Sequence, residues 1–254
     1  MLAHDVQRSR LVRIVAWNIE RNFHEKVGAV AALSPDLALI SECAPIDAMR
    51  AAGGALPPAE HASWGGPTGE SPLSRKGVAL LSFTGQRIEA IEGYDRTLEW
   101  IVPFRVCGER TLNVLGVWAK RKDGRKWGEL QRVIDGLSVY RDFIRERETI
   151  VLGDFNCNLA WDPKTARARR PRFADALHDI HDAGLRSVYH AVRGQPYGTE
   201  TEPTFRHHNG GNKFHIDYCF VPARWLGRDS QVRIDPDGGT WRSDHRPLVV
   251  DLDT

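Results

Sequence analysis

Length, composition and charge narrow the class of protein before any motif is considered. The chain has 254 residues, 41% of them hydrophobic, and a formal net charge of +2. This length commonly forms one α/β core, and this charge is too small for indiscriminate binding to nucleic acid. No apolar run approaches the roughly 20 residues that span a bilayer, so we expect a soluble globular protein with no membrane span.

Strands are predicted where short apolar or alternating runs are bounded by turn residues. In chain order, these runs lie at residues 11–17, 37–40, 78–83, 100–106, 112–118, 149–152, 215–221, 231–234 and 247–252. Helices are predicted where apolar residues recur three and four positions apart, at residues 27–33, 127–148 and 172–183. Residues 194–213 resemble a loop. Mixed strands with a few covering helices favour an α/β fold: a four-layer sandwich of two stacked mixed β-sheets flanked by helices.

The cysteines and the even composition of the chain indicate how it is organised. The cysteines are Cys43, Cys107, Cys157 and Cys219. They show no CxxC spacing, which argues against a zinc ribbon or a disulfide scaffold. We therefore expect a cytoplasmic location and no disulfide-linked partner. No composition shift marks a boundary, so residues 1–254 are predicted to form a single domain, with residues 1–10 as a flexible lead.

Polar side chains stand where the predicted strands end or begin. They are Asn18, Glu20, Glu42, Asp154, Asn156, Asp217, Asp244 and His245. In a largely antiparallel sheet, the ends of upward strands and the beginnings of downward strands meet at one rim. Carboxylates gathered there repel one another unless a cation neutralises them. Oxygen ligands without cysteine favour Mg²⁺, or Mn²⁺ as a substitute, and a phosphoester is the natural substrate.

Five ordered segments carry a family resemblance. They are Ala16–Glu20 (AWNIE), Leu39–Glu42 (LISE), Gly153–Asn156 (GDFN), His215–Tyr218 (HIDY) and Ser243–Leu248 (SDHRPL). Together they resemble the endonuclease/exonuclease/phosphatase superfamily, which includes exonuclease III-type and DNase I-like nucleases. The resemblance implies a DNase I-like fold and a metal-dependent phosphoric ester hydrolase. It also implies that Glu42 is the principal metal ligand, supported by Glu20 and Asp244.

The same resemblance implies roles for the remaining polar residues. Asp154 would orient and deprotonate the attacking water, with Asn156 positioning it and Asn18 holding the geometry. His245 would bind the phosphate, and Asp217 would hold its imidazole in the charged form. The spacing of Asp154 and Asn156 also predicts that both side chains lie on one side of an extended segment. Taken singly, each carboxylate could be a surface ion pair and each asparagine a turn cap.

One position departs from the family pattern. Many relatives carry a histidine or tyrosine after the central strand, where this chain has Trp118. An indole cannot transfer a proton at neutral pH. Protonation of the leaving group would therefore fall to water or to His245.

Candidates for substrate contact lie in loops around the predicted rim. They are Trp118, Arg206, Lys213 and Trp241, with basic clusters at residues 120–126 and 167–172. Each could track phosphates or stack on bases. The plainer interpretation is that the cations are solvated loop residues and that the aromatic residues belong to the core.

Three functions remain open from the sequence. The first is a Mg²⁺-dependent phosphodiesterase that hydrolyses nucleic acid by metal-assisted in-line attack of water. The second is the same chemistry on a small phosphoester, phosphoinositide-like or nucleotide-like. The third is a binding module that has lost turnover, with Trp118 as its only support. Loops decide between the first two, and loops are what a sequence predicts least well.

Overall fold

A computed structural model shows the arrangement of most of the chain. It describes residues 11–56, 58–68, 71, 73–91, 93–121, 124, 126–164, 170–208, 211–236 and 243–253. The predicted lead at residues 1–10 and Trp241 lie outside the described residues, as do parts of both basic clusters. Within the described part, no helix has the length and apolar character needed to cross a bilayer.

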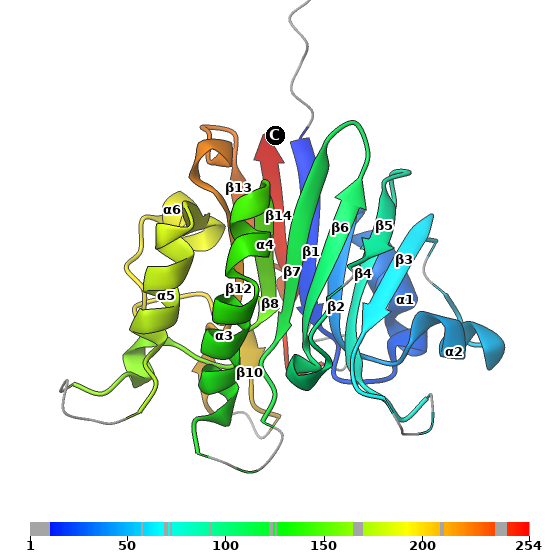
Figure 1. Cartoon of the computed structure of the whole chain (residues 1–254), viewed down its shortest axis with the longest axis horizontal. Coiled ribbons are helices and arrows are strands. Elements are labelled where there is room, and N and C mark those ends of the chain that lie inside the picture. The colour runs from blue at the N-terminus through cyan, green and yellow to red at the C-terminus, as the bar shows by residue number, and fades with distance from the viewer. Residues whose placement is uncertain are drawn as a thin grey trace, which may run out of the picture.

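Two six-stranded sheets form the centre of the molecule (Figure 1). The first runs β13 (Gln231–Ile234), β14 (Leu248–Asp253), β1 (Leu11–Asn18), β2 (Leu37–Cys43), β4 (Gly77–Ser82) and β3 (His61–Gly65). The second runs β5 (Arg87–Ala90), β6 (Ile101–Cys107), β7 (Thr111–Trp118), β8 (Thr149–Asp154), β12 (Asp217–Pro222) and β9 (Leu185–Ser187). Among the described strands, β1 pairs with β2 and β7 with β8 in parallel, and the other pairings are antiparallel. The predicted pair of mixed sheets is thus confirmed.

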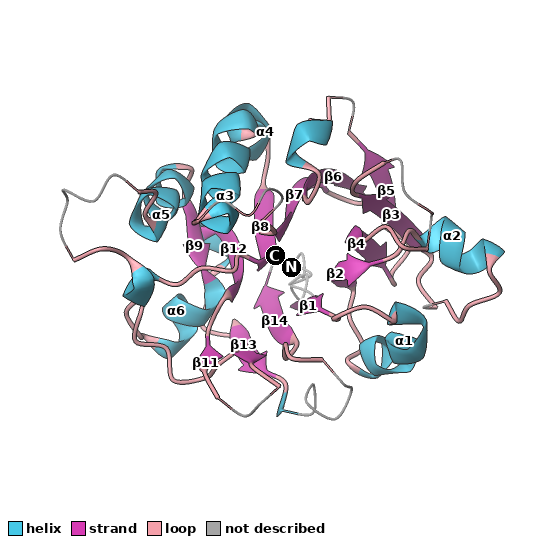
Figure 2. Cartoon of the chain, turned by 90° about the horizontal axis from the view of Figure 1, so that it is seen from below, coloured by secondary structure: helices cyan, strands magenta, loops and turns pink. Residues whose placement is uncertain are grey.

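Helices cover the outer faces of both sheets (Figure 2). On the first sheet they are α1 (Phe23–Ala32) and α2 (Ile46–Ala51), and on the second α3 (Gly128–Val139), α4 (Arg141–Glu146) and α5 (Phe173–Asp182). A sixth helix, α6 (Val188–Arg193), packs against both β12 and β13. The order helix, sheet, sheet, helix confirms the predicted four-layer sandwich.

Strand β1 shows why the layers form. Its side chains alternate between the two faces of the sheet, as the strand period requires. Ile14 and Ala16 enter the core between the sheets, whereas Val15 and Trp17 pack in the core beneath α1. A strand that buries both faces needs a layer on each side.

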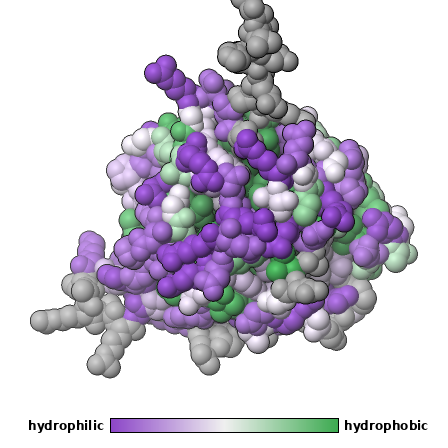
Figure 3. Space-filling model, turned by 45° about the horizontal axis from the view of Figure 1, so that its top comes forward, coloured by the Kyte–Doolittle hydropathy of each residue, from purple (hydrophilic) through white to green (hydrophobic). Residues whose placement is uncertain are grey.

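The surface outside these layers is mainly polar. Figure 3 shows hydrophilic side chains over most of one face, with hydrophobic surface in small scattered patches. Among the described residues, the large hydrophobic side chains that are exposed are Leu11, Leu73 and Val139. Because they lie far apart in the chain and in separate elements, we assign them no binding role.

The structure corrects several predicted elements. The single helix over residues 127–148 is wrong: it is two helices that meet at Tyr140. The backbone of Tyr140 leaves the helical conformation there, with φ -95° and ψ 18°, and its hydroxyl accepts a hydrogen bond from the Asp95 backbone amide at 2.9 Å. The loop at 194–213 also contains β10 (Phe205–Arg206), which pairs with β11 (Lys213–Phe214). Helix α2 and strands β3 and β5 were missed because such short elements carry almost no periodicity.

Candidate active site

The predicted polar residues meet at one rim, at the lower end of the sheets in Figure 1. Strands β1, β2 and β8 end there, whereas β12 and β14 begin there. In the register of β8 and β12, Asp154 stands directly opposite Asp217. Pairing of strands far apart in sequence is therefore what brings these side chains together.

Asp154 occupies the centre of the rim. Its side chain is fully buried, and Oδ2 accepts hydrogen bonds from Asn18 Nδ2 at 2.9 Å and Asn156 Nδ2 at 3.1 Å. Oδ1 accepts the backbone amide of Asn156 at 2.9 Å. Burial raises the pKa of the Asp154 carboxyl, although the neighbouring His245 opposes the shift. A carboxylate held in one rotamer with a raised pKa can accept a proton from water near neutral pH.

The side chains of Asp154 and Asn156 lie together, as their spacing predicts. The segment is not extended throughout, however, because Asn156 has a positive φ of 49°.

His245 lies between two buried carboxylates. Its Nδ1 is 2.8 Å from Asp217 Oδ2, and its Nε2 is 3.8 Å from Asp154 Oδ2. Burial alone would lower the pKa of His245, but the charges of Asp217 and Asp154 outweigh it and raise the pKa. The imidazole thus keeps its proton and can bind an anion such as phosphate.

Two hydroxyl groups that the sequence analysis did not single out hold this arrangement. The buried Thr204 hydroxyl accepts the backbone amides of Ile216 and Asp217 at 3.0 and 3.1 Å. Ser243 Oγ donates to the Asn18 carbonyl at 2.8 Å and accepts the His245 amide at 3.1 Å. Ser243 lies inside the quoted SDHRPL segment, whereas nothing in the sequence marks Thr204.

A second acidic cluster lies beside the triad of Asp154, Asp217 and His245. Ligand atoms of Glu20, Asp244 and His208 all lie within 4.8 Å of one another. Glu20 Oε1 is 2.5 Å from His208 Nε2, and Glu20 Oε2 accepts the Asp244 amide at 3.1 Å. Burial and the charge of Glu20 raise the pKa of Asp244, although His245 opposes this. Carboxylates that repel one another beside an imidazole fit a hard divalent cation.

The loop that carries Glu20 has an unusual backbone. Glu20, Arg21 and Asn22 all have positive φ, at 47°, 67° and 50°, a conformation that costs energy in residues other than glycine. Buried Lys26 stabilises the loop: its Nζ donates to the carbonyls of Ile19 and Arg21. Glu20 therefore lies in a strained loop whose conformation is held by the hydrogen bonds of Lys26.

Glu42, the predicted principal metal ligand, does not join this cluster. It also has positive φ, at 62°, and Oε1 pairs with Arg21 Nε at 3.2 Å. Neither group of three possible metal ligands found among the described residues includes it.

Comparison with known proteins identifies the chain. The model of the endonuclease/exonuclease/phosphatase family matches residues 15–245. The chain belongs to this family. A search of curated proteins finds no match.

Solved structures agree with the family fold. The catalytic domain of Xenopus laevis APE2 aligns with a TM-score of 0.70 at 16% identity, covering 95% of this chain and 92% of that one. An AP endonuclease from Archaeoglobus fulgidus has a TM-score of 0.66 at 17% identity, covering 96% and 100%. The 3′ phosphatase NExo from Neisseria, bound to a product DNA hairpin, has the same TM-score, identity and coverage. These likenesses confirm the DNase I-like fold.

Trp118, which the sequence analysis expected to depart from the family pattern, lies in the core. Its indole is only 4% exposed and packs edge-on against Trp100, with ring centroids 5.7 Å apart. Lys120 Nζ lies over both rings, 5.2 Å from the centroid of Trp100 and 4.8 Å from that of Trp118. Trp118 thus has little surface to offer a substrate, and the charged group beside it is the Lys120 ammonium.

Arg206 and Lys213 are side by side across the β10–β11 pair, and both are exposed. The Arg206 amide donates to the Asp244 carbonyl at 2.7 Å. The backbone of this hairpin therefore lies beside Asp244.

Proposed function

We propose that the protein is a Mg²⁺-dependent phosphodiesterase that hydrolyses nucleic acid by in-line attack of water. The observation that carries the proposal is His245, held between Asp217 and Asp154 and next in the chain to Asp244 of the acidic cluster. A phosphate bound by His245 would face a base on one side and a cation site on the other. This is the arrangement that phosphodiester hydrolysis requires.

Asp154 takes the proton from the attacking water. Asn18 and Asn156 fix its rotamer, so the carboxylate pays no reorganisation cost during the reaction. Charged His245 binds a phosphate oxygen and stabilises the charge that develops on it. With an indole at position 118, His245 is also the group available to protonate the leaving oxygen, unless water does so.

Glu20 and Asp244 would hold Mg²⁺, with His208 beside them and Glu42 as the further ligand that the family resemblance implies. Mn²⁺ would substitute. The bound ion supplies a Lewis acid that polarises the phosphate oxygens.

Nucleic acid is the proposed substrate class for two reasons. Structural relatives include an AP endonuclease and a phosphatase bound to a DNA hairpin, and the hairpin that carries exposed Arg206 and Lys213 bonds Asp244 through its backbone. A cytoplasmic location is consistent with the four cysteines, all of which are unpaired.

Hydrolysis by purified protein tests the proposal. Plasmid, abasic oligonucleotide, RNA and small phosphoesters are incubated with Mg²⁺, with Mn²⁺ and with EDTA. We expect metal-dependent cleavage of nucleic acid, which Asp154→Asn and His245→Gln each slow by a factor on the order of 10² or more. Asp229→Asn and His178→Gln, at exposed positions, serve as matched controls. Hydrolysis that survives EDTA, or none with any phosphoester, would refute it.

A further inference from the structure

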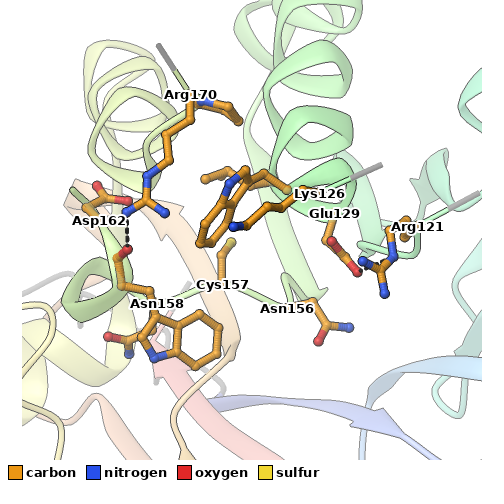
Figure 4. A pocket seen from close by; sticks show the side chains of 12 residues that line it. Arg121, Lys126, Glu129, Asn156, Cys157, Asn158, Asp162 and Arg170 are labelled. Atoms are coloured by element: carbon orange, nitrogen blue, oxygen red, sulfur yellow. Dashed lines mark hydrogen bonds and ion pairs between the residues drawn. The ribbon is translucent and has the colours of Figure 1, made fainter. Parts of the chain in front are cut away.

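A pocket opens next to Asn156, and the other residues that line it have no part in the mechanism above. Its volume is about 280 Å³, close to the lower end for small-molecule sites. Asn156, which bonds Asp154, forms part of its wall, and two indoles line it, Trp127 and Trp161. Figure 4 shows Arg170 and Lys126 on the opposite side of the pocket from Asn156. Cys157 lies between these two cations and Asn156.

The two indoles leave surface free. Both are partly exposed, and no ring contact joins them, whereas Trp100 and Trp118 in the core pack directly together. A pair of indoles with only a packing role would be buried or in mutual contact. Arg170 lies over the Trp127 ring, but the part of each indole that stays exposed beside the cavity is surface on which a planar ring can stack.

The wall that carries Trp161 is rigid. Asn158 Oδ1 accepts the Ala160 amide at 2.8 Å, and its Nδ2 donates to the His215 carbonyl at 2.9 Å. These bonds fix the short helix η2 (Leu159–Trp161). Phe214 packs edge-on against the Trp161 ring, with centroids 4.7 Å apart. A site fixed in advance loses little entropy when it binds.

Arg170 joins the two aromatic walls. Its guanidinium lies 4.0 Å from the centroid of the Trp127 ring, and its Nη2 donates to the Trp161 carbonyl at 3.0 Å. Among the described lining residues, three are cations (Arg121, Lys126 and Arg170) and two are carboxylates (Glu129 and Asp162). Glu129 pairs with Arg121. The lining therefore carries a small excess of positive charge.

We propose that this pocket binds one unpaired nucleobase of a nucleic-acid strand and so directs the attached phosphate to Asp154 and His245. The inference rests on the proposed function and narrows its substrate to strands with an unpaired nucleotide at the cleavage position. Stacking supplies affinity without sequence preference, and the cations favour the phosphates that flank the base.

Binding in EDTA tests the pocket without turnover. The probes are a labelled single-stranded dT decamer, a decamer of the same length that lacks all bases, a blunt duplex and dTMP, each followed by fluorescence anisotropy or competition. We expect the dT decamer to bind at least tenfold more tightly than the other three. Trp161→Ala and Trp127→Ala should each weaken binding of the dT decamer about tenfold, but that of the baseless strand less than twofold.

Control variants separate stacking from general damage. Phe143→Ala removes a half-exposed aromatic ring elsewhere on the same layer, and Arg228→Gln removes an exposed cation. Neither should change the preference for the dT decamer. Equal losses on both strands, no loss in the tryptophan variants, or tighter binding of duplex would overturn the proposal. If dTMP binds as tightly as the decamer, the pocket serves a small phosphoester and the strand is excluded.

The two proposals fail separately. Base-dependent binding in EDTA without hydrolysis of any phosphoester in Mg²⁺ would refute the proposed function and leave the pocket intact. Hydrolysis of nucleic acid without base-dependent binding would refute the pocket alone.

Discussion

The buried indole of Trp17 donates a hydrogen bond from Nε1 to the backbone carbonyl of His245, at 3.0 Å. The two residues are 228 positions apart in the chain. Trp17 lies near the end of β1, and His245 precedes β14, which pairs with β1. The bond therefore holds the backbone of His245 against the end of β1. Asn18, the next residue of β1, bonds Asp154, so both catalytic groups are positioned from the same strand end.

Trp17→Phe should impair catalysis through this bond. The ring still fills most of the site, but the His245 carbonyl loses its partner, which costs about 1–3 kcal/mol in a buried position. We expect the free energy of unfolding to fall by that amount and kcat to fall on the order of tenfold, with KM little changed. Trp225→Phe removes a comparable bond, to Glu148 Oε1 at 3.0 Å, at the opposite end of the sheets. If both variants lose the same fraction of kcat, Trp17 has no positioning role.

Asp217→Asn should remove the charge that keeps His245 protonated. The amide can still accept the Nδ1 hydrogen, so the imidazole stays in place, but the pKa of His245 falls because a raising charge is lost. We expect kcat to fall on the order of 10² without a large loss of thermal stability. Steady-state kinetics and thermal unfolding check this, with Asp229→Asn as the exposed control. A near wild-type rate would contradict the role of Asp217.

Much of the fold and of the catalytic triad was predictable because polar residues at the ends of apolar runs mark where strands end. Asp154, Asp217 and His245 stand beside short apolar runs, and strand pairing brings such positions to one rim. The break at Tyr140 was hidden because the apolar spacing continues through it, and the hydrogen bond of Tyr140 to Asp95, 45 residues away, leaves no local pattern. Contacts made by loops were equally hidden: a sequence does not show which loop residue reaches Glu20, and the structure places His208 there.

Gly153→Ala should destabilise the protein severely. Gly153 has φ of 130°, which residues with a side chain rarely adopt. An added Cβ would collide with the backbone carbonyl of Val117, on the neighbouring strand β7. We expect a loss of more than about 3 kcal/mol, measured as a large fall in Tm or as insoluble protein. Gly28→Ala is the control, because nothing lies within 4 Å of its added Cβ, and it should be neutral or slightly stabilising. A stable Gly153→Ala protein would mean that β7 and β8 are not paired as described.

Glu200→Gln should change how stability depends on acid. The Glu200 side chain is 3% exposed and accepts hydrogen bonds from His190, Gly198 and Asn158. Burial raises the pKa of Glu200, but these bonds outweigh it and lower the pKa to about 2, from an ordinary value of 4.5. A carboxyl whose pKa is lower in the folded state stabilises the fold fully above pH 4.5, and this stabilisation is lost as the pH falls toward 2. At about 1.4 kcal/mol per pKa unit, the loss is about 3 kcal/mol.

Urea denaturation at pH 7, 4.5 and 3 checks this dependence. The Glu200→Gln variant should be less stable than wild type at pH 7, and the difference should shrink as the pH falls, because only the wild-type residue loses its charge. Glu202→Gln is the matched control: its ion pair with Arg193 is partly exposed and contributes at most about 1 kcal/mol. Parallel stability curves for wild type and Glu200→Gln would contradict the lowered pKa. Because Glu200 also holds Asn158, the variant should weaken binding of the dT decamer as well, whereas a change in stability alone would leave that affinity intact.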